Sequence, residues 1–135
     1  IYGSGSRYTD IKKMESENIN VNPYTDRSEI LKQTKNSTFA LVSLSSSLTV
    51  EGFPGKTFDY LKMNKILIGY SNPLSGLARF IKKYNVGINI DPENPNIDSA
   101  LKDLKNLDEI YQNIEDVNLK YANLNTVSQQ YLNLL

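Results

Sequence analysis

The chain has 135 residues, a length that fits one domain able to bury about two thirds of its unfolded surface. Its 15 basic and 15 acidic side chains cancel, so no net charge attracts nucleic acid or an anionic membrane. It contains no cysteine and no histidine, which excludes disulfides, thiolate nucleophiles, Ser-His-Asp catalysis and His-based metal sites within this chain.

Neither a membrane-spanning segment nor a secretory signal is visible in the sequence. No run approaches the ~20 apolar residues of a spanning helix, and the first five residues lack the charged-then-apolar pattern of a signal peptide. The absence of cysteine is typical of a cytoplasmic protein. Because the chain begins without Met, on what reads as the tail of a strand, we expect it to be part of a longer protein.

Hydrophobic spacing predicts alternating strands and helices along the chain. In order, we expect a strand end over 1–6, a helix over 7–17, a strand over 19–21, a helix from 26 or 28 to about 35, a strand over 39–44, a helix over 54–63, a strand over 65–70, a helix over 76–84, a strand over 87–90, a helix over 96–104, and further helix from 107 with a last piece carrying Val127, Tyr131, Leu132 and Leu135. This alternation with short connections predicts an α/β fold, a doubly wound, Rossmann-like parallel sheet. We expect residues 1–106 to form this domain and 107–135 to be a helical tail that packs on it.

The apolar run at 39–44 is the clearest candidate for a buried strand. The segment after it is the main candidate for a binding site. Glu51 and Asp59 lie eight positions apart and bracket a helix start that contains Pro54 and Gly55. Amides in the first turn of a helix lack intrahelical partners, and the helix dipole favours an anion there. A loop carboxylate and an exposed helix carboxylate are the ordinary interpretation of such a pair. In the other interpretation, the amides bind a phosphate and the carboxylates accept hydrogen bonds from hydroxyl groups. Such a site would suit a sugar nucleotide.

Other candidates near this segment have two interpretations each. Lys56 is a surface lysine or a positive charge beside a diphosphate, and Thr57 fills a helix position or donates its hydroxyl to phosphate. The residues Tyr24, Thr25 and Asp26 follow a strand and either frame a base or form an ordinary loop. The helix start at Gly76 faces the ligand or only turns the chain.

These residues resemble the C-terminal, donor-binding half of a GT-B glycosyltransferase of the group 1 class, also called family 4. Glu51 to Asp59 is similar to the Glu-x7-Glu motif of that family, with Asp as the second acid. Residues 54–61 look like the Pro-Ser-Lys-x-aromatic-Glu-Tyr-Leu variant of bacterial surface-polysaccharide enzymes. Further stretches match other landmarks of the family: residues 1–5, 66–68, 76–78 and 85–88.

The resemblance implies a role for each residue that matches the motif. Glu51 would be the catalytic residue and would contact the sugar hydroxyls of the donor, and Asp59 would bind the ribose hydroxyls. The backbone from Gly52 through Phe53 and Pro54 to Gly55 would hold the diphosphate, with Lys56 and Thr57 close by. Tyr24, Thr25 and Asp26 would lie near the nucleobase.

The resemblance also implies an activity, which is retaining transfer of a sugar from a UDP- or GDP-sugar. The acceptor would be a lipid-linked (polyprenyl diphosphate) or growing saccharide in O-antigen or capsule synthesis. The enzyme would be cytoplasmic, with peripheral contact to the inner membrane made elsewhere in the protein, and would need no metal or other cofactor. The resemblance places two further parts of the protein before Ile1. One is the first strand and helix of this domain, with an Arg and a Lys that clamp the diphosphate. The other is the N-terminal GT-B domain. We therefore expect the present chain alone to be inactive and to bind donor weakly.

Two other functions remain open from the sequence. One is a non-catalytic sugar-nucleotide-binding subunit of a split transferase. The other is a flavodoxin-like regulatory domain in which the Glu51 and Asp59 pair is accidental, although the strand ends at 2–3 and 44–45 lack the acidic cluster of a response regulator.

Overall fold

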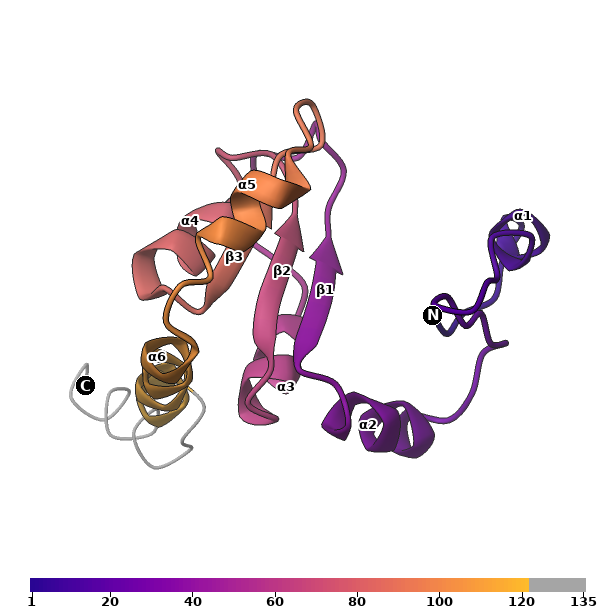
Figure 1. The fold of residues 1–135 in the computed structure, drawn as a ribbon, viewed down its shortest axis with the longest axis horizontal. Coiled ribbons are helices and arrows are strands. Elements are labelled where there is room, and N and C mark those ends of the chain that lie inside the picture. The colour runs from indigo at the N-terminus through magenta and orange to yellow at the C-terminus, as the bar shows by residue number, and fades with distance from the viewer. Residues whose placement is uncertain (122–135) are drawn as a thin grey trace, which may run out of the picture. The chain divides into compact units, whose positions relative to one another are not determined.

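The computed structural model describes residues 1–121 (Figure 1), and the predicted last piece with Val127, Tyr131, Leu132 and Leu135 lies outside the described residues. The chain forms two compact units, Ile1–Asn36 and Ser37–Leu135. Among the described residues, no helix combines the length and the apolar character needed to cross a membrane.

The first unit contains two helices and a short pairing of extended segments. Helix α1 spans Tyr8–Lys12 and helix α2 spans Arg27–Lys35. Tyr2 and Asn22 form a parallel bridge, in which the Asn22 N–H donates to Ile1 O at 2.8 Å. Helix α1 is shorter than the predicted 7–17 because Glu15 has left the helix and accepts a hydrogen bond from the Val21 N–H at 3.1 Å.

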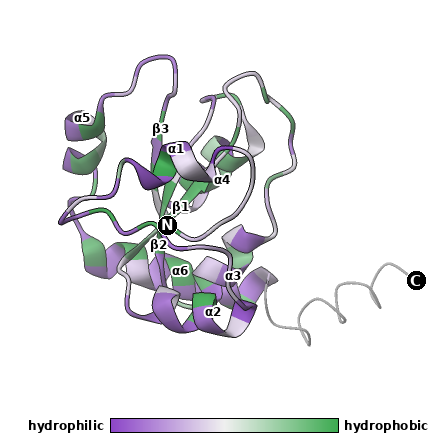
Figure 2. Cartoon of the chain, turned by 90° about the vertical axis from the view of Figure 1, so that its right-hand side faces the viewer, coloured by the Kyte–Doolittle hydropathy of each residue, from purple (hydrophilic) through white to green (hydrophobic). Residues whose placement is uncertain are grey.

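The second unit is built on a parallel sheet, as the alternating pattern predicts. Strands β1 (Phe39–Ser43), β2 (Ile66–Tyr70) and β3 (Gly87–Ile90) lie in the order β1-β2-β3. Four helices follow or separate them: α3 (Lys56–Lys62), α4 (Gly76–Tyr84), α5 (Ile97–Lys102) and α6 (Leu107–Tyr121). Figures 1 and 2 show α3 and α4 on one side of the sheet and α5 on the other. The described part of the second unit is therefore an α/β unit with helices on both sheet faces.

The core of this unit lies between the sheet, α3, α4 and α6. Three residues of α6 at helical spacing, Ile110, Ile114 and Val117, are buried there. They pack in one cluster with Val42, Leu61, Ile66, Leu67, Leu77, Ile81 and Val86. The described part of the predicted tail thus packs on α3, α4 and β2.

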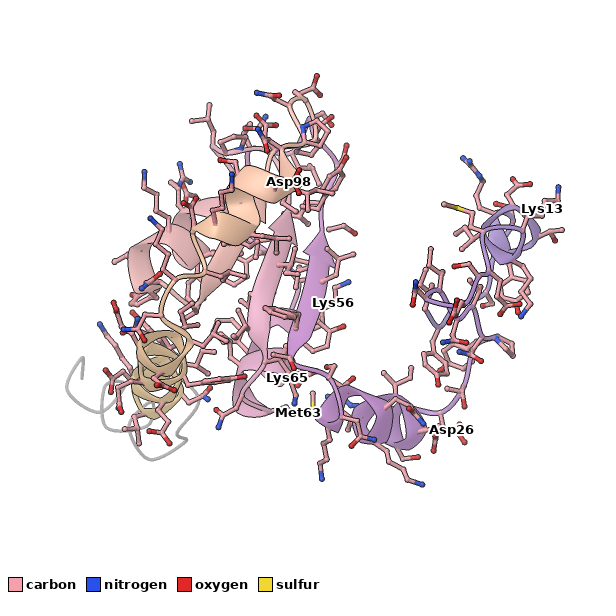
Figure 3. All side chains as sticks on the ribbon, in the orientation of Figure 1. Lys13, Asp26, Lys56, Met63, Lys65 and Asp98 are labelled. Carbon is pink, nitrogen blue, oxygen red and sulfur yellow. The ribbon has the colours of Figure 1, made fainter. Side chains whose placement is uncertain are left out.

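Strand β1 is half-buried, which corrects the expectation of a buried strand at 39–44. Ala40 and Val42 are buried, whereas Leu41 is 58% exposed. A continuous apolar run does not reveal which face is covered, since neighbouring side chains point to opposite faces. The start of the sheet is fixed by Lys65 (Figure 3), whose Nζ donates to Ser37 O at 2.7 Å.

Candidate functional site

The loop between β1 and α3, residues 44–55, lies at the carboxyl ends of the parallel strands, where α/β sheets bind ligands. Its backbone is hydrogen-bonded to the last residue of β2 and to the segment that follows β2. The Leu44 N–H donates to Tyr70 O at 2.9 Å, and Asn72 Nδ2 donates to Ser46 O at 2.9 Å. The loop is therefore anchored near its start by hydrogen bonds.

The far side of the loop crosses the first residue of α4 in close contact. The Gly76 N–H donates to Val50 O at 2.9 Å. A Cβ at position 76 would lie 1.9 Å from the carbonyl oxygen of Glu51, a separation that no side chain tolerates. Glycine at this position is what allows the backbone of Glu51 to pack on the helix. Gly76 thus supports the backbone of Glu51, and the hypothesis that this helix start faces a ligand stays a prediction.

A buried polar chain fixes the start of α4 against the sheet. Ser75 is the N-cap, and its Oγ accepts from the Ala78 N–H at 3.1 Å. The same hydroxyl is 2.9 Å from Ser71 Oγ, which donates to Asn89 Oδ1 at 2.7 Å. Asn89 Nδ2 returns a bond to Ser71 O at 2.8 Å. Ser71, Ser75 and Asn89 each have a hydrogen-bond partner in this network. The network therefore orders the start of α4, on which the loop packs.

Phe53 attaches the loop to the two neighbouring helices through aromatic contacts. Its ring centroid lies 5.7 Å from Phe58 of α3 and 5.0 Å from Phe80 of α4. Phe80 in turn contacts Tyr84 at 4.9 Å. Such pairs contribute about 0.5–1.5 kcal/mol each beyond area burial, so the residue next to Gly52 has a defined place. The packing of the Phe53 side chain therefore fixes the backbone segment that is predicted to bind a diphosphate.

Glu51 points toward α4 and forms an ion pair there. Its Oε1 pairs with Arg79 Nη2, and the two side chains are 86% and 48% exposed. The carboxylate is thus fixed in direction yet accessible to solvent and to a ligand. The sequence analysis did not identify Arg79, and no local signal would have found it, because the pair joins a loop to a helix that begins after another strand.

The start of α3 presents unpaired backbone donors. The N–H groups of Thr57 and Phe58 donate to Pro54 O at 3.0 Å and Gly55 O at 3.1 Å. Within residues 1–121, the N–H groups of Gly55 and Lys56 have no hydrogen-bond partner. Gly55 occupies the N-cap position and provides no side-chain cap. These two amides and the exposed Lys56 are the groups that an anion would meet.

Thr57 and Asp59 differ in accessibility. Thr57 is fully buried, and its Oγ1 has no hydrogen-bond partner among the described residues. This burial favours the interpretation that Thr57 fills a helix position. Asp59 is half-buried on α3. The pKa of the neighbouring Tyr60 phenol is raised, mainly by the burial of Tyr60 and to a smaller extent by the Asp59 carboxylate.

The remaining predicted residues, Tyr24, Thr25 and Asp26, belong to the first unit, and Glu51 to Asp59 belong to the second. The position of residues 24–26 near a nucleobase stays a prediction. Tyr24 is 71% exposed. Asp26 precedes α2 as its N-cap residue.

Within the described residues, no group of three or more acidic side chains is placed to hold a metal ion. No protein-family model, curated protein or solved structure matches this chain.

The close contact at Gly76 predicts a large effect of a single methyl group. We expect Gly76→Ala to lower the free energy of unfolding by about 1–3 kcal/mol, because the added Cβ must displace the Glu51 backbone. Urea unfolding followed by circular dichroism measures this loss. Gly52→Ala is the matched control, since no heavy atom lies within 4 Å of its Cβ position. Equal effects of both substitutions would contradict the contact.

The unpaired hydroxyl of Thr57 predicts an effect in the opposite direction. Thr57→Val should leave stability unchanged or raise it by about 1 kcal/mol, because an isosteric apolar group removes a buried unsatisfied donor. Thr57→Ser, which keeps the hydroxyl and loses the methyl group, should lower stability. Urea unfolding of the three proteins compares them. A stability loss in Thr57→Val would mean that the hydroxyl has a hydrogen-bond partner.

Proposed function

We propose that this chain is the donor-binding part of a retaining glycosyltransferase and corresponds to the C-terminal, doubly wound half of a GT-B fold. The single observation that carries the proposal is the arrangement at the Glu51 loop. An accessible carboxylate is fixed by its backbone and side chain just before a helix start with unpaired amides. The order of motifs that resembles family 4 enzymes supports the same function.

The chemistry of the loop suits a sugar nucleotide. The amides of Gly55 and Lys56, with the Lys56 ammonium, bind the diphosphate, whose two charges favour a helix start. Glu51 accepts hydrogen bonds from the transferred sugar, and Asp59 accepts them from the ribose. During transfer, the bond from the anomeric carbon to the diphosphate oxygen breaks, and the oxygen of an acceptor hydroxyl bonds to that carbon with retained configuration. The hydroxyl proton passes to the leaving diphosphate. The amides stabilise the charge that develops on the leaving diphosphate.

The full reaction needs parts beyond these residues. The acceptor, a lipid-linked or growing saccharide, binds to an N-terminal GT-B domain, and an Arg and a Lys upstream complete the diphosphate clamp. In this proposal the transferase works in the cytoplasm against the inner membrane surface, with a UDP-sugar as preferred donor and a GDP-sugar as the other choice. A split transferase, in which the acceptor domain is a separate chain, uses the same donor site. A fused acceptor domain upstream of Ile1 in the parent gene would exclude the split arrangement.

Binding of UDP tests the proposed site directly. We expect millimolar UDP to shift the backbone amide NMR signals of residues 53–59 more than those of α6, because the phosphates and ribose meet the loop and the start of α3. A titration of the ¹⁵N-labelled chain measures both sets of signals. Uniform shifts, or none, at 10 mM UDP would contradict the site, and equal shifts with inorganic phosphate would exclude a nucleotide-specific role.

Asp59 is the residue whose predicted contact is to the nucleoside. Asp59→Ala should weaken UDP binding by about 1–3 kcal/mol, the value of a charge-assisted hydrogen bond, which raises the dissociation constant at least about fivefold. The same NMR titration measures the change. Asp98→Ala is the matched control, since Asp98 is an acidic residue in the first turn of α5. Unchanged UDP affinity in Asp59→Ala would remove Asp59 from the site.

A further inference from the structure

We propose that Arg79 is a positioning residue that holds the Glu51 carboxylate ready for the hydroxyl groups of the donor sugar. This inference rests on the proposed function and adds to it a residue on a different secondary-structure element. It assigns to the first turns of α4 the selection of the sugar, whereas the start of α3 binds the nucleotide diphosphate.

Both partners of the ion pair are held by backbone contacts at the start of α4. The Glu51 backbone is packed on Gly76 and the preceding carbonyl is bonded to the Gly76 N–H. Arg79 lies one turn further along the same helix, and its own N–H donates to Ser75 O at 3.1 Å. The helix that supports the Glu51 backbone therefore also supplies the cation for its carboxylate. A shift of α4 would move both contacts together.

The pair is too exposed to be needed for folding. Side chains that are 86% and 48% accessible form an ion pair of the kind that contributes little to stability, because water screens the charges. Its effect is on conformational freedom. A glutamate side chain that is already restricted loses less entropy when a ligand binds, and such preorganisation increases affinity.

The ion pair leaves one oxygen of the Glu51 carboxylate unused. The pair uses Oε1 of Glu51, and within residues 1–121 no side-chain hydrogen bond or other ion pair occupies Oε2. A carboxylate oxygen accepts hydrogen bonds only, so its fitting partner is a donor such as a sugar hydroxyl. Arginine suits the supporting role because its planar group holds a carboxylate with several donors in fixed directions, whereas lysine provides a mobile point charge.

The other basic residues of α4 have different surroundings. Lys83 Nζ lies 5.3 Å from the centre of the Tyr84 ring. Lys82 borders a cavity of about 410 Å³ with Asn85, Asp91 and Asp103. Lys82 therefore provides a matched control, since it is a cation on the same helix that is not paired with Glu51.

The experiment separates binding of the nucleotide from binding of the sugar. The 135-residue chain and its variants Arg79→Gln, Arg79→Lys and Lys82→Gln are titrated by NMR with UDP, UDP-glucose, UDP-galactose and UDP-N-acetylglucosamine, and with GDP and GDP-mannose. Arg79→Gln should weaken the best sugar nucleotide at least threefold and change binding of the bare nucleotide less than twofold. Arg79→Lys should be intermediate, and Lys82→Gln should equal the parent. Without ligand, Arg79→Gln should also shift the amide signals of Glu51 and Gly52 more than Lys82→Gln does.

Each other result has a defined meaning. Equal losses for the sugar nucleotide and the bare nucleotide in Arg79→Gln would indicate a purely structural role and overturn the inference. Unchanged binding in Arg79→Gln, or a parent chain that binds no sugar nucleotide more tightly than the bare nucleotide, would overturn it while leaving the nucleotide site intact. Absence of any nucleotide binding to the parent would overturn the proposed function and this inference with it.

Discussion

A loop that crosses the start of a helix in direct backbone contact leaves no space for a side chain at the crossing point. In this protein that point is Gly76, where any Cβ would lie 1.9 Å from Glu51 O. The hydrogen bond from the Gly76 N–H to Val50 O fixes the position of the loop along α4. The contact of Glu51 with Arg79 and the place of Phe53 between α3 and α4 depend on this crossing.

In the second unit, the residues around the loop are held in place by contacts, whereas the Glu51 side chain is accessible to solvent. Ser71, Ser75 and Asn89 are joined by hydrogen bonds at the end of the sheet and keep the start of α4 in place. The aromatic contacts of Phe53 provide an apolar attachment on the opposite side of the loop. Between these two attachments Glu51 remains exposed. An acid on an ordered backbone with an accessible side chain is what recognition of a polar ligand needs.

The order and type of the elements in the second unit were predictable from the sequence, because short apolar runs separated by helical spacing leave few alternatives. Helix α4 and strand β3 have the predicted bounds. The prediction was less accurate where side chains compete with local preference. Helix α1 ends early because Glu15 bonds to Val21, and β1 is buried on one face because burial of a strand depends on what packs against it.

The segment that carries the candidate site could be chosen from the order of residues alone. Glu51, the Pro54 and Gly55 turn and Asp59 are close in the chain, and their spacing is set by covalent connection and helix geometry. Three further features became visible in the folded chain: Glu51 pairs with Arg79, Gly76 supports the Glu51 backbone, and Thr57 is buried. These contacts join residues of different elements, and parallel strands bring such residues together only when the intervening helices pack on the sheet.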